Sequence, residues 1–397
     1  MAQYSAMRNK DKHTRFNGIK QLSAAFPSLF ACLLAIICYL AGGMAYAEPY
    51  KVGFTAFSSC DTQTWTRMDI AVWYPTESKK KASTIRDMPV SFRAVRKAKP
   101  AEGTFPLILI SHPSSGTRFS AYDTAMDLAQ EGYVVASLTH PKDNLDNMPH
   151  AFSWELFSGR VADLSTLIDT LLANETVAHA IDPERIGVVG FENGATAALI
   201  MGGALPSCSQ WASYCPDTAS SRDVYCNSWA KARITTEICG RLPLKKSLAD
   251  RRIKAVCAVK PGFPMLFPAD SLRYFYPALL LVTPDDDASE FAGLEKRFQL
   301  PPEHLRMAVR AEGALLAPCP EDLASDLPAL CLSVKEDDRQ ELHTQFAAAL
   351  IRFCNTHLKL SGPKYIPEPP DLTPPPPPKP EPQKKGKKSS GKKKARQ

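Results

Sequence analysis

The sequence predicts an α/β protein in which helices cover both faces of a mostly parallel central sheet. Short apolar runs alternate with segments of helical periodicity between residues 68 and 358. The run at residues 106–111 (PLILIS) is almost entirely apolar, which is typical of a strand buried on both faces. Repeated strand–helix units favour a parallel sheet with helices on both sides. Ligand sites in such sheets lie beyond the carboxyl ends of the strands, so candidate functional residues are those that follow each strand.

The individual elements follow from periodicity. Apolar runs predict strands at residues 68–74, 106–111, 133–138, 186–189, 253–259, 278–282 and 306–309. Apolar residues spaced three and four apart predict helices at residues 120–131, 155–172 and 339–358, and one that begins at Gly194. A polar insert at residues 208–248 interrupts the alternation, and we expect it to cap the strand ends.

The turn between the strand at 186–189 and the next helix carries the most specific motif. It reads Gly190-Phe191-Glu192-Asn193-Gly194, with a glycine two residues on either side of Glu192. A strand, a strained turn and a helix with this glycine spacing form the layout of a nucleophile elbow. The elbow normally carries serine at its centre, and this sequence carries Glu192 there.

The first 47 residues have the pattern of a secretory signal. Basic residues precede the apolar run at 26–40, and Ala45-Tyr46-Ala47 provides a cleavage site of the A-x-A type. The sequence therefore predicts a periplasmic or secreted protein whose mature chain begins at Glu48. The alternative is an uncleaved segment that anchors the chain in the inner membrane.

The positive net charge of the chain, +7, comes from its two ends. Residues 1–47 carry a net +4 and the terminus at 384–396 carries +8, which leaves −5 for the rest. A mildly acidic body argues against nucleic acid as a partner.

The cysteines fit an oxidising compartment. We expect the four in the insert (Cys208, Cys215, Cys226 and Cys239) to form disulfides, in a pairing that the sequence leaves open. Cys257 and Cys354 are expected to be buried thiols. Cys319 and Cys331 flank a short loop, and no cysteine or histidine spacing indicates a zinc site.

Residues 361–397 form a tail of different composition. Residues 363–382 include eleven prolines, which predicts an extended polyproline II segment, and the lysine-rich block at 384–396 follows. Two interpretations stay open: a solvated tail without a partner, or a cationic tip attracted to an anionic membrane or cell-wall surface.

Four stretches together resemble the α/β-hydrolase branch that contains dienelactone hydrolases and platelet-activating-factor acetylhydrolase-like esterases. They are LISH at 109–112, EGYVVA at 131–136 with His140-Pro141 and Asp143-Asn144, DPERIGVVG at 182–190, and LAPCP at 316–320. The resemblance covers about residues 50–358. It implies an α/β-hydrolase domain at 48–360, ester or lactone hydrolysis as the family's reaction, and no cofactor.

The resemblance also assigns positions to the family's catalytic residues, and this chain departs from the family at most of them. Glu192 stands at the nucleophile position and Glu312 at the position of the histidine base, while Asp286 matches the acid. The oxyanion loop, which usually reads His-Gly, reads His112-Pro113, and proline has no N–H to donate. The remaining residues expected at the oxyanion site are Ser114 and Asn193.

Three interpretations of Glu192, Asp286 and Glu312 follow. In the first, which we expect, the scaffold persists and ester hydrolysis is impaired, because a serine and its base are both absent. In the second, carboxylates catalyse hydrolysis with His112 or His140 as the base. In the third, the carboxylates bind a hard cation such as Ca²⁺. A small ester-like or acidic ligand is a further candidate occupant of the pocket.

Serines near the oxyanion loop are a weaker alternative to the elbow as nucleophiles. Ser111, Ser114, Ser115 and Ser120 lie in this region, but none occupies an elbow. We interpret them as loop and helix-cap serines.

Overall fold

The computed structural model describes residues 48–60, 66–87, 90–215, 223–244, 246–284, 303–307 and 335–359, with a few single positions between 294 and 328. The chain divides into Met1–Glu48 and Pro49–Gln397, and every described residue except Glu48 belongs to the second unit. The predicted signal peptide at 1–47 and the tail at 361–397 lie outside the described residues. In the part that is described, no helix has the length and hydropathy needed to cross a membrane.

One sheet organises the second unit, and the described residues contribute ten strands to it. Their spatial order is β10-β9-β8-β7-β5-β6-β2-β1-β4-β3. The strands are β1 (Lys51–Cys60), β2 (Arg67–Thr76), β3 (Ser83–Asp87), β4 (Val90–Arg96), β5 (Phe105–Ser111), β6 (Val134–Thr139), β7 (Ile181–Phe191), β8 (Ile253–Val259), β9 (Ala278–Pro284) and β10 (Glu303–Met307).

The strand order reverses direction at β5. β5 pairs in parallel with β6 on one side and with β7 on the other. Ser111, the last residue of β5, lies opposite Gly190 of β7. The loop that leaves β5 and the turn that leaves β7 therefore meet at one point, and this is where a doubly wound sheet binds its ligands.

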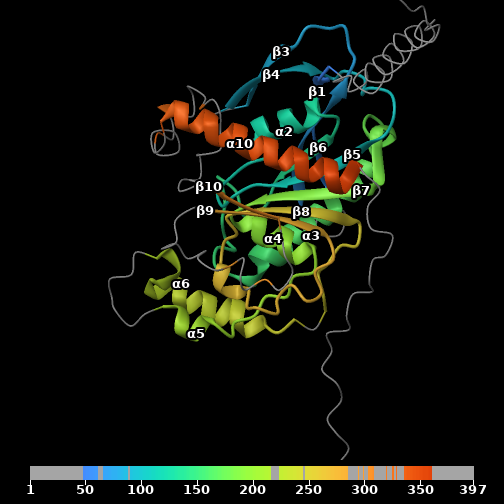
Figure 1. Ribbon diagram of the computed structural model, residues 1–397. Coiled ribbons are helices and arrows are strands. Elements are labelled where there is room, and N and C mark those ends of the chain that lie inside the picture. Colours follow the sequence, from blue (N-terminus) through green and yellow to red (C-terminus); the bar gives the residue numbers. More distant parts are fainter. Residues whose placement is uncertain are drawn as a thin grey trace, which may run out of the picture. The chain divides into compact units, whose positions relative to one another are not determined.

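Helices cover both faces of the sheet, as Figure 1 shows. On one face lie α3 (Trp154–Leu172) and α4 (Asn193–Met201), and on the other lie α2 (Tyr122–Gln130) and α10 (Glu336–Cys354), which continues into a π-helical turn at Asn355–Lys359. Each face has its own apolar core. Leu107, Leu109 and Phe157 belong to the first core, and Ile108, Ile110 and Phe346 to the second. The alternation of neighbouring β5 residues between the two cores explains why that strand is apolar at every position before Ser111.

The predicted α/β architecture is confirmed. The strand expected at 306–309 begins earlier, at Glu303, and residues 308–309 lie outside the described part of the chain. Three strands, β1, β3 and β4, were not predicted. They form a mostly antiparallel edge: β1 pairs with β2 and β3 with β4 in antiparallel register, whereas β1 and β4 pair in parallel. In β1 the second half alternates between half-buried and exposed residues, so it lacks the continuous apolar run that marks a central strand.

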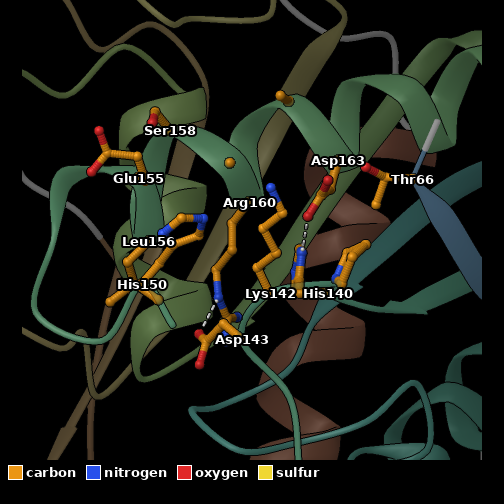
Figure 2. Close-up of a pocket in the computed structure, with 13 residues that line it drawn as sticks. Thr66, His140, Lys142, Asp143, His150, Glu155, Leu156, Ser158, Arg160 and Asp163 are labelled. Atoms are coloured by element: carbon orange, nitrogen blue, oxygen red, sulfur yellow. Dashed lines mark hydrogen bonds and ion pairs between the residues drawn. The ribbon is translucent and has the colours of Figure 1, made fainter. Parts of the chain in front are cut away.

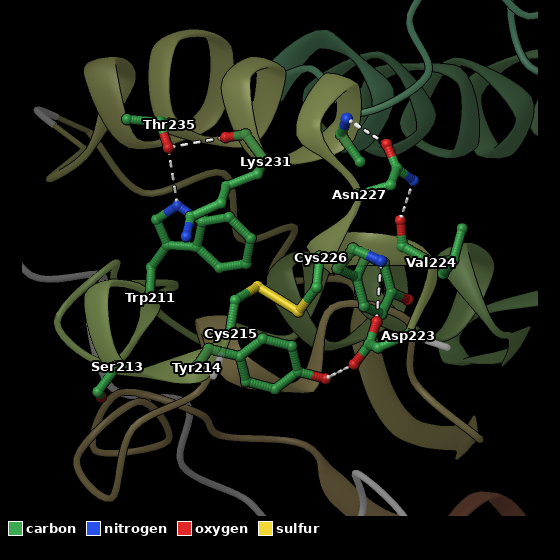
Figure 3. Close-up of a disulfide and its surroundings, with 12 residues drawn as sticks. Trp211, Ser213, Tyr214, Cys215, Asp223, Val224, Cys226, Asn227, Lys231 and Thr235 are labelled. Atoms are coloured by element: carbon green, nitrogen blue, oxygen red, sulfur yellow. Dashed lines mark hydrogen bonds between the residues drawn. A yellow bond between two sulfur atoms is a disulfide. The ribbon is translucent and has the colours of Figure 1, made fainter. Parts of the chain in front are cut away.

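The insert after α4 contains short helices closed by two disulfides. Cys208 is bonded to Cys239 and Cys215 to Cys226, which confirms the disulfides and supplies their pairing. Figure 3 shows the second bridge beside Tyr214, whose hydroxyl donates to Asp223 at 2.7 Å. Within the insert lie α5 (Trp211–Tyr214) and α6 (Ser228–Arg233). Outside it, Cys257 and Cys354 are buried, as predicted, and Cys319 is disulfide-bonded.

Candidate active site

The turn after β7 holds Glu192 in a strained backbone conformation. Glu192 has φ 52° and ψ −114° and is the N-cap residue of α4. A positive φ is rare for a residue with a side chain and costs about 1–3 kcal/mol, so the surrounding structure must impose it. Four other non-glycine residues with positive φ also follow strands or line loops of this region: Ser115, Phe152, Lys260 and Phe263.

The two glycines of the turn are required by close backbone contacts. A Cβ atom on Gly190 would lie 2.2 Å from the Gly194 carbonyl oxygen, and one on Gly194 would lie 2.2 Å from the Ser111 carbonyl oxygen. No side chain fits at either position. These contacts bring α4 directly against the end of β5, so the turn has the geometry of a nucleophile elbow.

The Glu192 carboxylate reaches back to the loop after β5. Its Oε2 accepts a hydrogen bond of 3.0 Å from the backbone N–H of Ser114. The backbone of Glu192 is also fixed, since its N–H donates to the Val259 carbonyl at 2.9 Å and its carbonyl accepts from the N–H of Gly262 at 3.0 Å. The apex residue is thus held by the loops after β5 and β8.

The residues expected at the oxyanion site lie around Glu192. Pro113 contributes no N–H, so the N–H of Ser114 is the donor that this loop aims at the elbow. Asn193, the residue after the apex, is buried, and its side-chain Oδ1 has no hydrogen-bond partner among the described residues. A carboxylate oxygen of Glu192 therefore lies where the Ser114 N–H would otherwise stabilise a negative charge that develops on a substrate oxygen.

Arg160 of α3 holds the loop after β5 in place through hydrogen bonds to its backbone. Its side chain is 1% exposed and forms an ion pair with Asp143. The same guanidinium donates to the carbonyl oxygens of His112 and Pro113, and to the Ser111 hydroxyl at 3.2 Å. A planar guanidinium can satisfy these acceptors at once because its donors point in fixed, diverging directions. The position of the Ser114 N–H thus depends on Arg160 in α3.

The two candidate bases, His112 and His140, are buried and already bonded at both ring nitrogens. His112 donates from Nδ1 to the Pro113 carbonyl at 2.7 Å, and its Nε2 accepts from the His140 N–H at 3.1 Å. Since a carbonyl only accepts and an N–H only donates, the neutral tautomer of His112 is determined. Burial, followed by the positive charge of Arg160, holds the pKa of both histidines well below the ordinary value.

His140 joins a hydroxyl to a carboxylate. The Ser111 hydroxyl lies 2.9 Å from His140 Nε2, and Asp163 Oδ2 lies 2.9 Å from His140 Nδ1. Because a carboxylate accepts, Nδ1–H donates to Asp163, and Nε2 of the neutral ring then accepts the proton of the Ser111 hydroxyl. These roles are those of a serine–histidine–aspartate triad.

In a catalytic triad the serine is exposed to the substrate and the aspartate is buried, and here the order is reversed. Ser111 is fully buried, whereas Asp163 is 24% exposed. A cavity of about 260 Å³ lies at the outer end, as Figure 2 shows, and its walls include His140, Arg160 and Asp163 but not Ser111. A nucleophile must meet the substrate, so this arrangement supports the loop after β5 rather than attack by Ser111.

Two of the positions predicted from the sequence cannot be placed. Asp286 and Glu312 lie outside the described residues. Where the structure describes the chain, it groups no three histidine, cysteine, aspartate or glutamate side chains in a way that fits a metal ion.

The sequence interpretation missed Arg160 and Asp163. Arg160 lies in register with the apolar face of α3, between Phe157 and Leu164, and all three side chains are buried. A cation on the buried face of a predicted helix requires a buried partner. That position was the signal that a polar network lies beneath this helix.

Comparisons with known proteins identify the fold. No protein-family model matches the chain, and no curated protein does either. Among solved structures, a ferulic acid esterase from Streptomyces cinnamoneus shares 16% identity with a TM-score of 0.50, covering 83% of this chain and 95% of that one. A dienelactone hydrolase from Anabaena variabilis shares 13% identity with a TM-score of 0.41, covering 77% and 99%. With its parallel centre, its reversal at β5 and a strained elbow after β7, this chain has the α/β-hydrolase fold.

Proposed function

We propose that this protein is a secreted relative of carboxylic ester hydrolases that has lost serine-based catalysis and retains ligand binding at the elbow. The observation that carries the proposal is the Glu192 carboxylate, which stands at the apex and accepts the Ser114 N–H. Ester hydrolysis by the usual route needs a hydroxyl at this apex and an unoccupied N–H for the substrate's carbonyl oxygen.

Glu192 opposes both requirements. It offers no hydroxyl, and its carboxylate accepts the hydrogen bond of the Ser114 N–H. Hydrogen bonds to charged groups contribute about 1.5–3 kcal/mol, so an incoming ester must displace a stronger acceptor than itself. The buried histidines do not provide Glu192 with a base, because the ring nitrogens of His112 and His140 bond to groups other than Glu192.

The carboxylate of Glu192 also limits which classes of ligand can bind beside it. A carboxylate repels a second carboxylate and accepts hydrogen bonds from hydroxyl or amine groups. A neutral, ester-like ligand with hydrogen-bond donors is therefore favoured over an acidic one.

The test is ester turnover by the purified mature protein with short-chain p-nitrophenyl esters. The wild-type protein is expected to show no turnover above the uncatalysed rate, and Glu192→Ser combined with Glu312→His is expected to restore some. Glu192→Ser alone is the matched control, because it opens the Ser114 N–H without supplying a base. Robust turnover by the wild-type protein that Glu192→Gln abolishes would instead establish the carboxylate-based hydrolase.

A second candidate function rests on the chain from Ser111 through His140 to Asp163. Its two 2.9 Å contacts match the distances that a serine hydrolase needs. It requires a movement that exposes Ser111. Turnover lost in Ser111→Ala and kept in Glu192→Gln would support this candidate over the first.

The cellular location is also a proposal. The A-x-A site before Glu48 and the disulfide-closed insert support export to an oxidising compartment. The lysine-rich terminus is proposed to bind anionic envelope surfaces. Deleting the residues after Gly362 should then release the protein from the envelope fraction, while the same deletion leaves any ligand binding at the elbow unchanged.

A further inference from the structure

A second cavity lies far from the elbow, at the antiparallel edge of the sheet. It has a volume of about 470 Å³ and is bounded by the start of β1, by β4, by α2 and by the loop between β2 and β3. Figure 1 shows β1, β3, β4 and α2 grouped together at this edge. This cavity takes no part in the site described above.

The strand register places this cavity at the opposite end of the sheet from Glu192. β2 runs antiparallel to β6, and Asp69, near the start of β2, lies opposite Thr139 at the carboxyl end of β6. Lys51, at the start of β1, lies opposite Thr76 at the end of β2. Lys51 is therefore at the amino end of the parallel strands, whereas Glu192 follows the carboxyl end of β7.

The cavity is lined by five cations and by no acidic residue. The cations are Lys51, Lys79, Lys80, Lys81 and Arg93. All five are exposed, and none forms an ion pair with an acidic residue of the described chain. Cations elsewhere do have acidic partners, since Arg67 pairs with Asp69 and Arg252 with Asp250. In a body whose net charge is negative, this concentration of unpaired positive charge is a local exception.

Two hydrogen bonds hold the cationic loop in place. The Lys51 ammonium donates to the Ser78 carbonyl at 3.1 Å, and the Arg93 guanidinium donates to the Ala82 carbonyl at 3.0 Å. Both ends of the segment with the three consecutive lysines are thus tied to the sheet. The like charges repel one another, so the arrangement disfavours the empty state and is relieved by an anion.

The floor of the cavity is apolar. Val52, Ala94 and Val95 are buried side chains, and Met126 of α2 is half-buried beside them. A cationic rim over an apolar floor matches a ligand that carries a multiply charged group on an apolar body. Lysine ammonium groups, as compact point charges, suit phosphate in particular.

We infer that this cavity binds an organic phosphate through Lys51, Lys79, Lys80, Lys81 and Arg93. The phosphate belongs either to a free phosphorylated compound or to a lipid headgroup, which present the same charged group. This binding does not depend on Glu192 or on the function proposed for the elbow.

The test uses the full mature chain at low ionic strength with two probes. Inorganic pyrophosphate is titrated by calorimetry, and binding to phosphatidic acid vesicles is compared with binding to phosphatidylcholine vesicles. The variant Lys79→Gln/Lys80→Gln/Lys81→Gln removes three charges from the cavity. The matched control, Lys384→Gln/Lys385→Gln/Lys387→Gln, removes three from the tail.

The dissociation constant of the cavity variant is expected to rise on the order of a hundredfold, since each lysine changes the binding constant about fivefold near an anionic surface. The tail variant should leave pyrophosphate binding unchanged, and added salt should weaken binding to the wild-type protein. Pyrophosphate binding identifies a free phosphate, whereas vesicle binding without pyrophosphate binding, weakened more in the cavity variant than in the tail variant, identifies a headgroup. If the wild-type protein binds neither probe, or if the cavity and tail variants lose binding equally, the inference is wrong.

Discussion

The frame of the elbow and its apex differ in how far the fold constrains them. The frame consists of Gly190 and Gly194, where a Cβ atom would clash with backbone, and of Arg160 and the buried histidines, which hydrogen bonds hold in place. The apex, Glu192, is half-buried, and its side chain accepts a hydrogen bond from the loop. Packing therefore determines the shape of the site, while the chemistry depends on one side chain that packing does not select. A fold can keep an active-site geometry after the reaction has changed.

The largest effect should come from adding one methyl group to the frame. Gly194→Ala places a Cβ 2.2 Å from the Ser111 carbonyl oxygen, a backbone atom that cannot move aside as a flexible side chain could. We expect a loss of more than about 4 kcal/mol in the free energy of unfolding. Gly159→Ala in α3 is the control, because a Cβ there meets nothing within 4 Å, and it should stabilise by about 1 kcal/mol. Urea unfolding measures both, and equal midpoints would contradict the role of the frame.

Removing the buried cation should have the next largest effect. Arg160→Met leaves the Asp143 carboxylate buried without its partner and frees the carbonyls of His112 and Pro113. The expected loss is about 3–5 kcal/mol. Arg67→Met is the control, because the Arg67 side chain is 73% exposed and its ion pair should contribute less than about 1 kcal/mol. Similar losses in the two variants would show that Arg160 is not part of a rigid frame.

The frame should also make stability depend on pH. Burial lowers the pKa of His112 and His140 in the folded state, so between that value and about 6.5 the unfolded chain binds more protons. Stability is then complete above pH about 6.5 and falls as the pH drops below it, by about 1.4 kcal/mol per unit for each histidine.

Chemical unfolding at a series of pH values between 5 and 8 measures this slope. His112→Gln should reduce the slope of the unfolding free energy against pH by the contribution of one histidine. Asp69 and Asp250, whose pKa values are lowered by Ser58 and by Arg252, act only at more acidic pH. A flat profile in this window would contradict the neutral, buried state of both rings.

The smallest effect should come from the apex itself. Glu192→Ala loses the Ser114 hydrogen bond and keeps the positive φ, so a destabilisation of about 1–2 kcal/mol is expected. Glu192→Gly loses the same bond but relieves the backbone strain, and it should be more stable than Glu192→Ala by about 1–2 kcal/mol. Thermal melts of the two variants compare them directly. If the glycine variant is no more stable than the alanine variant, the strain at residue 192 is not stored in the folded state.

The central sheet could be predicted because each of its strands contains a nearly continuous apolar run. β5 and β8 lie between two cores, and each gives a continuous apolar run in the sequence. The edge strands β1, β3 and β4 could not be found in this way. β1 and β4 themselves contain exposed positions, and their polar residues resemble those of loops.

The site was only partly predictable, for a different reason. Glu192 was found because the glycine spacing encodes a local backbone geometry. Arg160 and Asp163 act over long sequence distances: Arg160 contacts a loop 48 residues earlier in the chain, and Asp163 contacts His140. Their contacts follow from the register of β5, β6 and α3, which no local pattern encodes. The roles predicted for Asp286 and Glu312 stay predictions, because both lie outside the described residues.

The two bridges of the insert have a consequence for handling the protein. Both join cysteines within residues 208–239, so neither ties the insert to the sheet. In a reducing host the sheet should therefore assemble while the insert loses its covalent closure. Cys257 and Cys354, whose thiol pKa values burial raises, should not compete for these pairings. Material produced in a reducing cytosol should thus be reoxidisable after purification without unfolding the whole chain.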